Sequence, residues 1–145
     1  MPIIRVIEEF ARRQGLTSLA AEPDGSYILV LDGRARLVVD PRLASGALYL
    51  RIPLDLPELP EAGRAALYRS LLEANLPGAA VLGTMFSLDE EDQRIEIQRR
   101  VPLAREIDVA ELAQIVADLY GAAAHVARQA GLGFTEEGQS HSTST

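Results

Sequence analysis

Carboxylates are the residues with the clearest potential for chemistry in this sequence. Four of them are consecutive, Asp89-Glu90-Glu91-Asp92, and such a cluster can bind a metal ion or supply a general acid and base. A calcium loop of the EF-hand type, however, alternates its ligands and needs a central glycine, and this run has neither. Consecutive carboxylates between two strands point in different directions. We therefore interpret the run as the solvated tip of a hairpin.

Other reactive side chains are sparse. The chain has no cysteine, which excludes disulfides, thiolate metal sites and cysteine nucleophiles. The two histidines, His125 and His141, are distant in sequence from any other histidine, so a histidine metal site and a Ser-His-Asp triad are both poorly supplied. We predict no catalytic residue, no metal site and no cofactor, and hence no enzyme. A small hydrolase that uses the acidic run is the enzymatic alternative.

Charge and length limit the partners. Fourteen basic and 21 acidic residues give a formal charge of −7, which disfavours nucleic-acid binding. No apolar run approaches the roughly 20 residues of a membrane-spanning helix. Arg5, Glu8 and Glu9 interrupt the first apolar stretch, so we expect neither a signal peptide nor a membrane partner. With 145 residues, 48% of them hydrophobic, we expect a cytoplasmic protein with one core.

Periodicity predicts the elements that position these residues. Asp32-Gly33 lies between two β-rich runs and indicates a hairpin. The expected elements are a helix at 2–14, a possible short strand at 17–21, the hairpin strands within 26–41, a strand at 47–54, a helix at 61–76, strands at 80–88 and 93–101, and a helix at 108–130. Their order, α-β-β-β-α-β-β-α, predicts an α+β fold with an antiparallel sheet and its three helices on one face. We expect one domain over residues 1–131 and a polar, disordered tail over 132–145.

Apolar side chains exceed what such a monomer needs on one face. In the helix at 61–76 they cover a wide arc, which fits either a buried core helix or one that also forms a subunit interface. The strand Tyr27-Ile28-Leu29-Val30-Leu31 is apolar on both faces, whereas a sheet with one solvated face alternates. A partner protein, a second subunit or tight closure of the fold must therefore cover the second face.

The passage "LYRSLLEANLPGAAVLGTMFSLDEEDQRIEIQRRVPL", residues 67–103, resembles the signature region of type III secretion chaperones of the Tir chaperone (CesT) family, class I. The order of elements also matches, over about residues 1–130. The resemblance implies a non-enzymatic homodimer of the bacterial cytoplasm with a role in virulence. It would bind the N-terminal region of a secreted effector in extended form, keep it soluble and secretion-competent, and deliver it to the export apparatus, whose ATPase is a further partner. The alternative is a regulatory or housekeeping protein-binding module of the same fold without a secreted client.

The resemblance also implies roles for individual apolar residues. The dimer interface would comprise Tyr68, Leu71, Leu72, Leu76, Val81 and Leu82. The effector-binding patches would comprise Ile3, Ile7, Phe10, Leu29, Leu37, Leu50, Phe86, Ile95 and Ile97. For each of these residues the alternative is a place in the core of the monomer.

Overall fold

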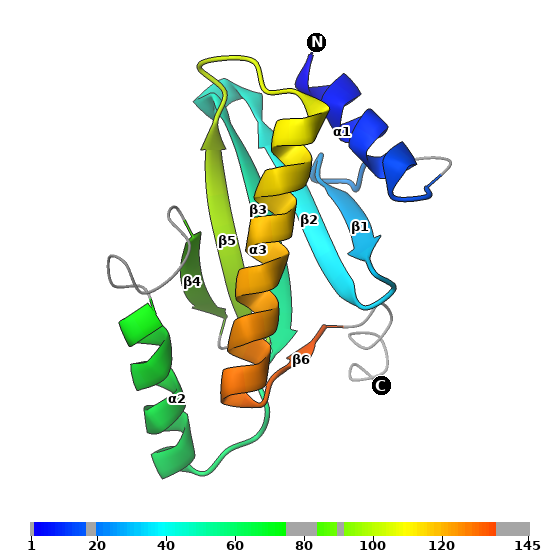
Figure 1. Ribbon diagram of the computed structural model, residues 1–145. Coiled ribbons are helices and arrows are strands. Elements are labelled where there is room, and N and C mark those ends of the chain that lie inside the picture. The colour runs from blue at the N-terminus through cyan, green and yellow to red at the C-terminus, as the bar shows by residue number, and fades with distance from the viewer. Residues whose placement is uncertain (1, 17–19, 75–83, 90–91, 136–145) are drawn as a thin grey trace.

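The computed structural model describes residues 2–16, 20–74, 84–89 and 92–135 (Figure 1). Its elements are α1 (Ile3–Arg13), β1 (Tyr27–Leu31), β2 (Ala35–Arg42), the 3₁₀ turn η1 (Leu43–Ser45), β3 (Ala47–Asp55), α2 (Glu61–Ala74), β4 (Thr84–Asp89), β5 (Arg94–Pro102), α3 (Val109–Ala130) and β6 (Gly133–Phe134). The expected order of helices and longer strands is confirmed. The short strand expected at 17–21 falls largely outside the described residues, and residues 20–21 are not in a strand.

The sheet is antiparallel, with the order β1-β2-β3-β5-β4. Its longest ladder joins β3 to β5 and runs from Ala47 opposite Pro102 to Asp55 opposite Arg94. In Figure 1, α3 crosses one face of the sheet and α1 lies beside it, whereas α2 stands next to β4 at the edge. The helices α1 and α3 therefore cover one face of the sheet, which we call the covered flank. The helix α2 lies at the edge beside β4, which we call the exposed flank.

Local chemistry explains where the elements end. Three residues, Asp32–Arg34, connect β1 to β2. Asp32 and Gly33 both have positive φ, 52° and 67°, and Arg34 N donates to Leu31 O at 2.9 Å, which closes the turn. The helix α1 ends at Arg13. Gly15 follows with φ of 91°, and Leu16 N donates to Ala11 O, which is a Schellman termination. The expected cap of α3 is confirmed, because Asp108 Oδ1 accepts from Glu111 N at 2.8 Å.

Alternation along β3 builds the core. Leu48, Leu50, Ile52 and Leu54 lie on one face and are fully buried, whereas Tyr49 and Arg51 lie on the other, as the sequence predicts. The apolar stripe of α3 covers this face through residues such as Leu112 and Leu119, and α1 adds Val6, Ile7 and Phe10. Removing apolar area from water contributes about 25 cal/mol per Å² to stability. The packing of α1 and α3 on the sheet is therefore the main source of the protein's stability.

The C-terminal end of the domain differs from the prediction. Leu132 and Thr135 are buried, and β6 pairs with β3 through Phe134 opposite Leu54 and Gly133 opposite Asp55. The boundary expected after residue 131 is therefore wrong, and the structured part continues through Thr135. The run is too short to show a period in sequence, and the polar residues that follow it hide the alternation of Leu132 and Phe134. Residues 136–145 lie outside the described residues.

Candidate interaction surfaces

The acidic run lies at a hairpin tip, as expected. The strand β4 ends at Asp89 and β5 begins at Arg94, and Asp92 N donates to Asp89 Oδ1 at 3.2 Å. Glu90 and Glu91 lie outside the described residues. Among the residues that the structure does describe, no three or more histidine or acidic side chains are placed to hold a metal ion. The described residues Asp89 and Asp92 are therefore joined by a hydrogen bond.

The carboxylates whose pKa is shifted belong to exposed surface pairs. Hydrogen bonds from Arg12, 2.8 Å from Nε to Oε2, lower the pKa of Glu9. Arg105 Nη2 lies 2.7 Å from Glu111 Oε2 and lowers the pKa of that carboxyl in the same way. Hydrogen bonds from the hydroxyl and amide of Ser26 lower the pKa of Asp24. Each shift favours the charged form at the surface, the opposite of the raised pKa of a general acid.

A hollow between α2 and β4 is lined mostly by apolar side chains. Leu71 and Phe86 form its buried floor, while Leu72 on α2 and Leu88 on β4 are 69% and 37% exposed. The hollow has a volume of about 270 Å³, and Tyr68 and Ser87 complete its lining. Exposed leucines around such a hollow are typical of a protein-binding surface. We call these six residues the α2–β4 surface.

Three of the residues expected at a dimer interface, Tyr68, Leu71 and Leu72, lie on the α2–β4 surface. The other three, Leu76, Val81 and Leu82, lie outside the described residues. The wide apolar arc of α2 also has a structural counterpart. Leu67 and Leu71 are buried within the protomer, whereas Leu72 points away from it. The helix therefore has one flank inside the protomer and one flank available to another chain.

Most of the residues expected to bind the effector belong to the protomer's own core. Eight of them are buried: Ile7, Phe10, Leu29, Leu37, Leu50, Phe86, Ile95 and Ile97. Little of these side chains is accessible on the folded protomer, although Phe10 lines a hollow beside α3 and Phe86 lines the hollow beside α2. Their assignment to a client-binding patch stays a prediction. Alternation identifies the apolar face of a strand but not what covers it, and here α1 and α3 cover it. Ile3 is half-buried and keeps an accessible part.

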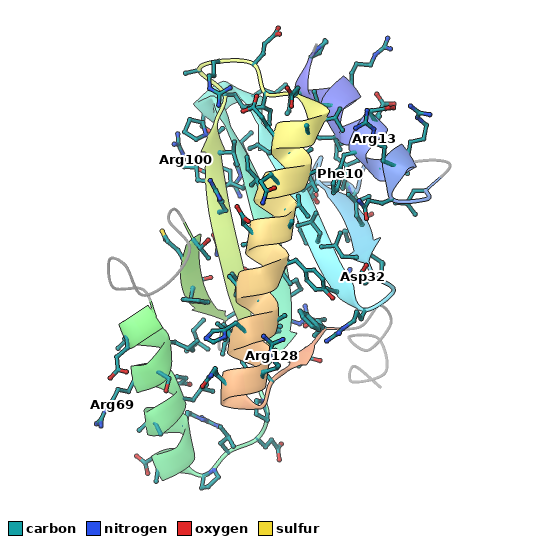
Figure 2. All side chains as sticks on the ribbon, in the orientation of Figure 1. Phe10, Arg13, Asp32, Arg69, Arg100 and Arg128 are labelled. Atoms are coloured by element: carbon teal, nitrogen blue, oxygen red, sulfur yellow. The ribbon has the colours of Figure 1, made fainter. Side chains whose placement is uncertain are left out.

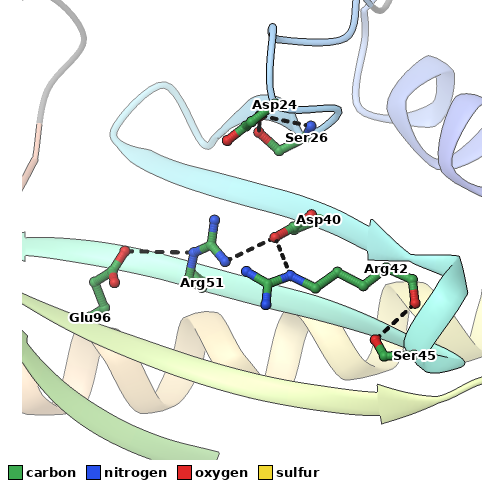
Figure 3. A network of polar contacts seen from close by, with 7 residues as sticks. All are labelled: Asp24, Ser26, Asp40, Arg42, Ser45, Arg51 and Glu96. Atoms are coloured by element: carbon green, nitrogen blue, oxygen red, sulfur yellow. Dashed lines mark hydrogen bonds and ion pairs between the residues drawn. The ribbon is translucent and has the colours of Figure 1, made fainter.

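The uncovered face of the sheet is polar at its centre. Asp40, only 9% exposed, accepts at Oδ2 from Arg42 Nε at 3.0 Å and from Arg51 Nη1 at 3.2 Å. The Arg51 Nε atom lies 3.7 Å from Glu96 Oε2, and this chain of contacts crosses β2, β3 and β5 (Figure 3). The guanidinium of Arg42 also lies 4.8 Å from the centre of the Tyr49 ring, within cation–π range.

The apolar part of this face is narrower than the sequence suggests. It lies on β1 and the adjoining part of β2, where Ile28 and Val38 are half-buried partners and Val30 is 37% exposed. From Asp40 onward along β2, paired charges take the place of apolar residues. Asp40 lies opposite Tyr49 of β3, beyond Val39, the last β2 residue that pairs with β1. A cover is therefore needed over one margin of this face, not over all of it.

Sequence reasoning missed two features beside α3. One is the packing of Phe134, whose ring centre lies 5.8 Å from that of Tyr120. The other is a hollow of about 150 Å³ between α1, the β1–β2 hairpin tip and α3. The available signal for the first was the pattern Leu132-Gly133-Phe134 after a helix-ending glycine. The second depends on the relative placement of three elements and has no signal in sequence.

Comparison with known proteins found a matching family model and solved structures of similar fold. A family model described as the Tir chaperone protein (CesT) family matches residues 5–127. The structure resembles the Yersinia pestis type III secretion chaperone SycH, solved in complex with a stable fragment of YscM2, with a TM-score of 0.62 and 19% identity over 84% of this chain and 97% of that chain. It also resembles the heterodimeric ExoU–SpcU complex of the Pseudomonas aeruginosa type III secretion system, with a TM-score of 0.60 and 20% identity over 83% of this chain and 94% of the matched chain.

A further structural relative has a different description. YbjN from E. coli, described as a candidate transcription regulator, matches with a TM-score of 0.64 and 14% identity over 93% of this chain and 97% of that one. No curated protein matches the sequence. At these identities the structural resemblances show a shared fold alone. None of the described helices combines the length and apolarity needed to cross a bilayer.

Proposed function

This chain belongs to the Tir chaperone protein (CesT) family, and we propose that it is a type III secretion chaperone. It binds the N-terminal region of a secreted effector in extended form and keeps that effector soluble and secretion-competent. The family match over residues 5–127 is the observation that carries the proposal. The setting proposed with it is the bacterial cytoplasm, with the ATPase of the export apparatus as a later partner.

The working unit we propose is a homodimer that joins at the α2–β4 surface. Leu72 is the centre of the argument, because a leucine that is 69% exposed beside an apolar hollow gains about 1.5–3 kcal/mol when fully buried. A twofold axis makes every such contact twice. Tyr68 and Leu71 would line the same interface. Leu76, Val81 and Leu82, which follow α2 in sequence, stay part of this proposal.

The client would bind as an extended segment at accessible positions. The strand β1 pairs on one side only with β2, and within the described residues its other edge has no strand partner, so an added strand can take up its backbone groups. Val30 on β1 offers an apolar contact there, and the accessible part of Ile3 on α1 offers another. Ordering a flexible segment costs a few kcal/mol. The free energy gained by burying its apolar side chains must exceed that cost. No nucleotide is needed for this binding.

We infer that the protein is not an enzyme. The described carboxylates with shifted pKa are paired at the surface and held in the charged form. The hollow between α2 and β4 and the hollow beside α3 are lined mostly by apolar side chains. This arrangement supports a role in binding rather than in a reaction.

The alternative is a regulatory or housekeeping module that binds a protein other than a secreted effector. The likeness to YbjN favours keeping it. Co-purification from the native cell, followed by mass spectrometry, separates the two. The chaperone proposal predicts a partner that is found in the secreted fraction and lost from it when this chain is deleted. A partner that stays inside the cell, with secretion unchanged by the deletion, supports the alternative.

A further inference from the structure

The C-terminal segment occupies a gap in the sheet. The strand β2 pairs with β3 only from Val38 to Arg42, opposite Arg51 to Ala47, so the last residues of β3 lack a β2 partner. Pro53, the second residue past that ladder, has no amide hydrogen to offer a neighbouring strand. Its carbonyl still needs a donor, and Thr135 N donates to Pro53 O at 3.2 Å. The first residues of β2, Ala35–Leu37, pair with β1 but not with β3, and the segment Leu132–Thr135 pairs with the end of β3 in their place.

Side chains hold this segment from three elements. The guanidinium carbon of Arg34, in the β1–β2 turn, lies 5.0 Å from the centre of the Phe134 ring. Tyr120 of α3 contacts the same ring at 5.8 Å between centres, tilted by 44°. Thr135 Oγ1 donates to Asp55 Oδ1 at 2.7 Å. The gap therefore accepts an extended backbone, an aromatic ring and a hydroxyl group.

Tyr120, which contacts Phe134, also lines a hollow along α3. Its volume is about 150 Å³, and Leu31, Val116 and Phe10 line it as well. A cavity of about this size can hold a benzene-sized ring. No residue of the segment Leu132–Thr135 lines it. Figure 2 shows Phe10 on α1 and Asp32 at the hairpin tip, both beside α3, where the hollow lies.

We propose that Leu132–Thr135 is an internal stand-in for an extended segment of a bound protein. The gap beside β3 and the adjoining hollow, which we call the C-terminal groove, form one peptide-docking site. Its external occupant is an extended segment of the client with one aromatic side chain at the place of Phe134 and a second apolar side chain in the hollow. The identity of that occupant as the client rests on the proposed function.

Exchange requires the internal segment to open locally. Its strand has only two residues and Phe134 is half-buried, which keeps the cost of opening low, while the burial of Leu132 and Thr135 opposes it. A longer segment that also fills the hollow buries more apolar surface than the stand-in does. Binding would release the chain beyond Gly131 from β3. When no client is bound, the internal segment pairs with the last residues of β3, which lack a β2 partner. These backbone groups are then not available for pairing with other chains.

The first test uses the full chain and its own sequence as the probe. The peptide Gly-Leu-Gly-Phe-Thr-Glu-Glu, corresponding to residues 131–137, is labelled and titrated into wild-type protein and the F134A variant. The tethered segment competes at a high effective concentration, so F134A should bind the peptide at least about tenfold more tightly than wild type. A peptide with alanine for phenylalanine should bind neither protein. Equal affinity of both proteins for the original peptide would overturn the proposal.

A second variant answers the question even where F134A folds poorly. The chain contains no tryptophan, so F134W places a single fluorescent indole in the groove and retains an aromatic ring. An excess of the unlabelled peptide should shift the emission to the red as the indole is released into water, and the alanine peptide should not. L43W, in the exposed turn η1 at a position that is 61% exposed, is the matched control. Emission from F134W that does not respond to the peptide would contradict exchange.

These experiments are separable from the proposed function, because neither uses an effector. A failure of peptide exchange leaves the chaperone proposal standing, with Leu132–Thr135 as a fixed part of the fold. If the peptide exchanges but no secreted partner co-purifies, the C-terminal groove remains a peptide-docking site. A secreted client as its occupant would then be excluded.

Discussion

The two flanks of the sheet use the same residue types for different purposes. On the flank covered by α1 and α3, Leu50 and Leu119 are fully buried. On the flank beside α2 and β4, Leu72 and Met85 are 69% and 62% exposed. Leucine in the first setting stabilises the monomer, and leucine in the second is available to another chain. The difference shows that the number of apolar residues in an element does not reveal its role until its covering elements are known.

Leu50→Ala should have the largest effect on folding and tests the covered flank. Removing a fully buried side chain from the middle of β3 leaves a cavity and should lower the free energy of unfolding by about 2–5 kcal/mol. Chemical denaturation followed by circular dichroism measures the change. Met85→Ala, at an exposed position on β4, is the control and should change stability little. Equal losses in both variants would remove the distinction between the flanks.

Leu72→Asp tests the exposed flank and should act on assembly. A charge in the α2–β4 surface should raise the dissociation constant of the proposed dimer at least about 100-fold, since an apolar residue at the centre of an interface contributes disproportionately. Light scattering across a concentration series measures it. The monomer should remain folded, because this side chain is already in water. Leu43→Asp is the control, at a similarly exposed leucine. A strictly monomeric wild-type protein at tens of micromolar would refute the interface.

Asp108→Ala has a smaller expected effect and sharpens the account of the covered flank. Its side chain caps α3 at Glu111 N, so its loss should cost about 1 kcal/mol of stability. Asp108→Ser, which keeps a capping oxygen, should recover most of the loss. Thermal unfolding of the three proteins gives the order. If the alanine and serine variants were equally destabilised, the cap would not be the cause.

The smallest effect concerns pH. The pKa of Glu9 and of Glu111 is lowered below its ordinary value of 4.5 by arginine hydrogen bonds. A carboxyl with a lowered pKa in the folded state stabilises that state above its unfolded pKa, and the contribution is lost as pH falls through the folded value. Stability should therefore decline below about pH 4.5, and Glu9→Gln should weaken that decline. Because both pairs are exposed, added salt should also reduce the effect. A pH dependence unchanged in Glu9→Gln would exclude this pair as a source.

Sequence periodicity predicted the elements more completely than it predicted their surroundings. The Asp32-Gly33 turn, the alternation of β3 and the Asp108 cap each follow from a few neighbouring residues, and the structure confirms each of them. The burial of Leu37 and Ile97 could not be predicted in this way, because it depends on helices distant in sequence. The place of Phe134 could not be predicted for the same reason, since Arg34 and Tyr120, which hold its ring, lie far from it in the chain. Turns, caps and strand alternation can be predicted from a few neighbouring residues. An interface cannot, because it depends on several segments that are distant in sequence.

The central claim is that this protein holds an N-terminal segment of another protein in extended form. Native mass spectrometry tests it most directly, on the complex purified from the native cell and trimmed with protease. We predict two copies of this chain with one protected fragment from the N-terminal region of a secreted protein. A single copy of this chain bound to an intact, protease-resistant globular domain would contradict it.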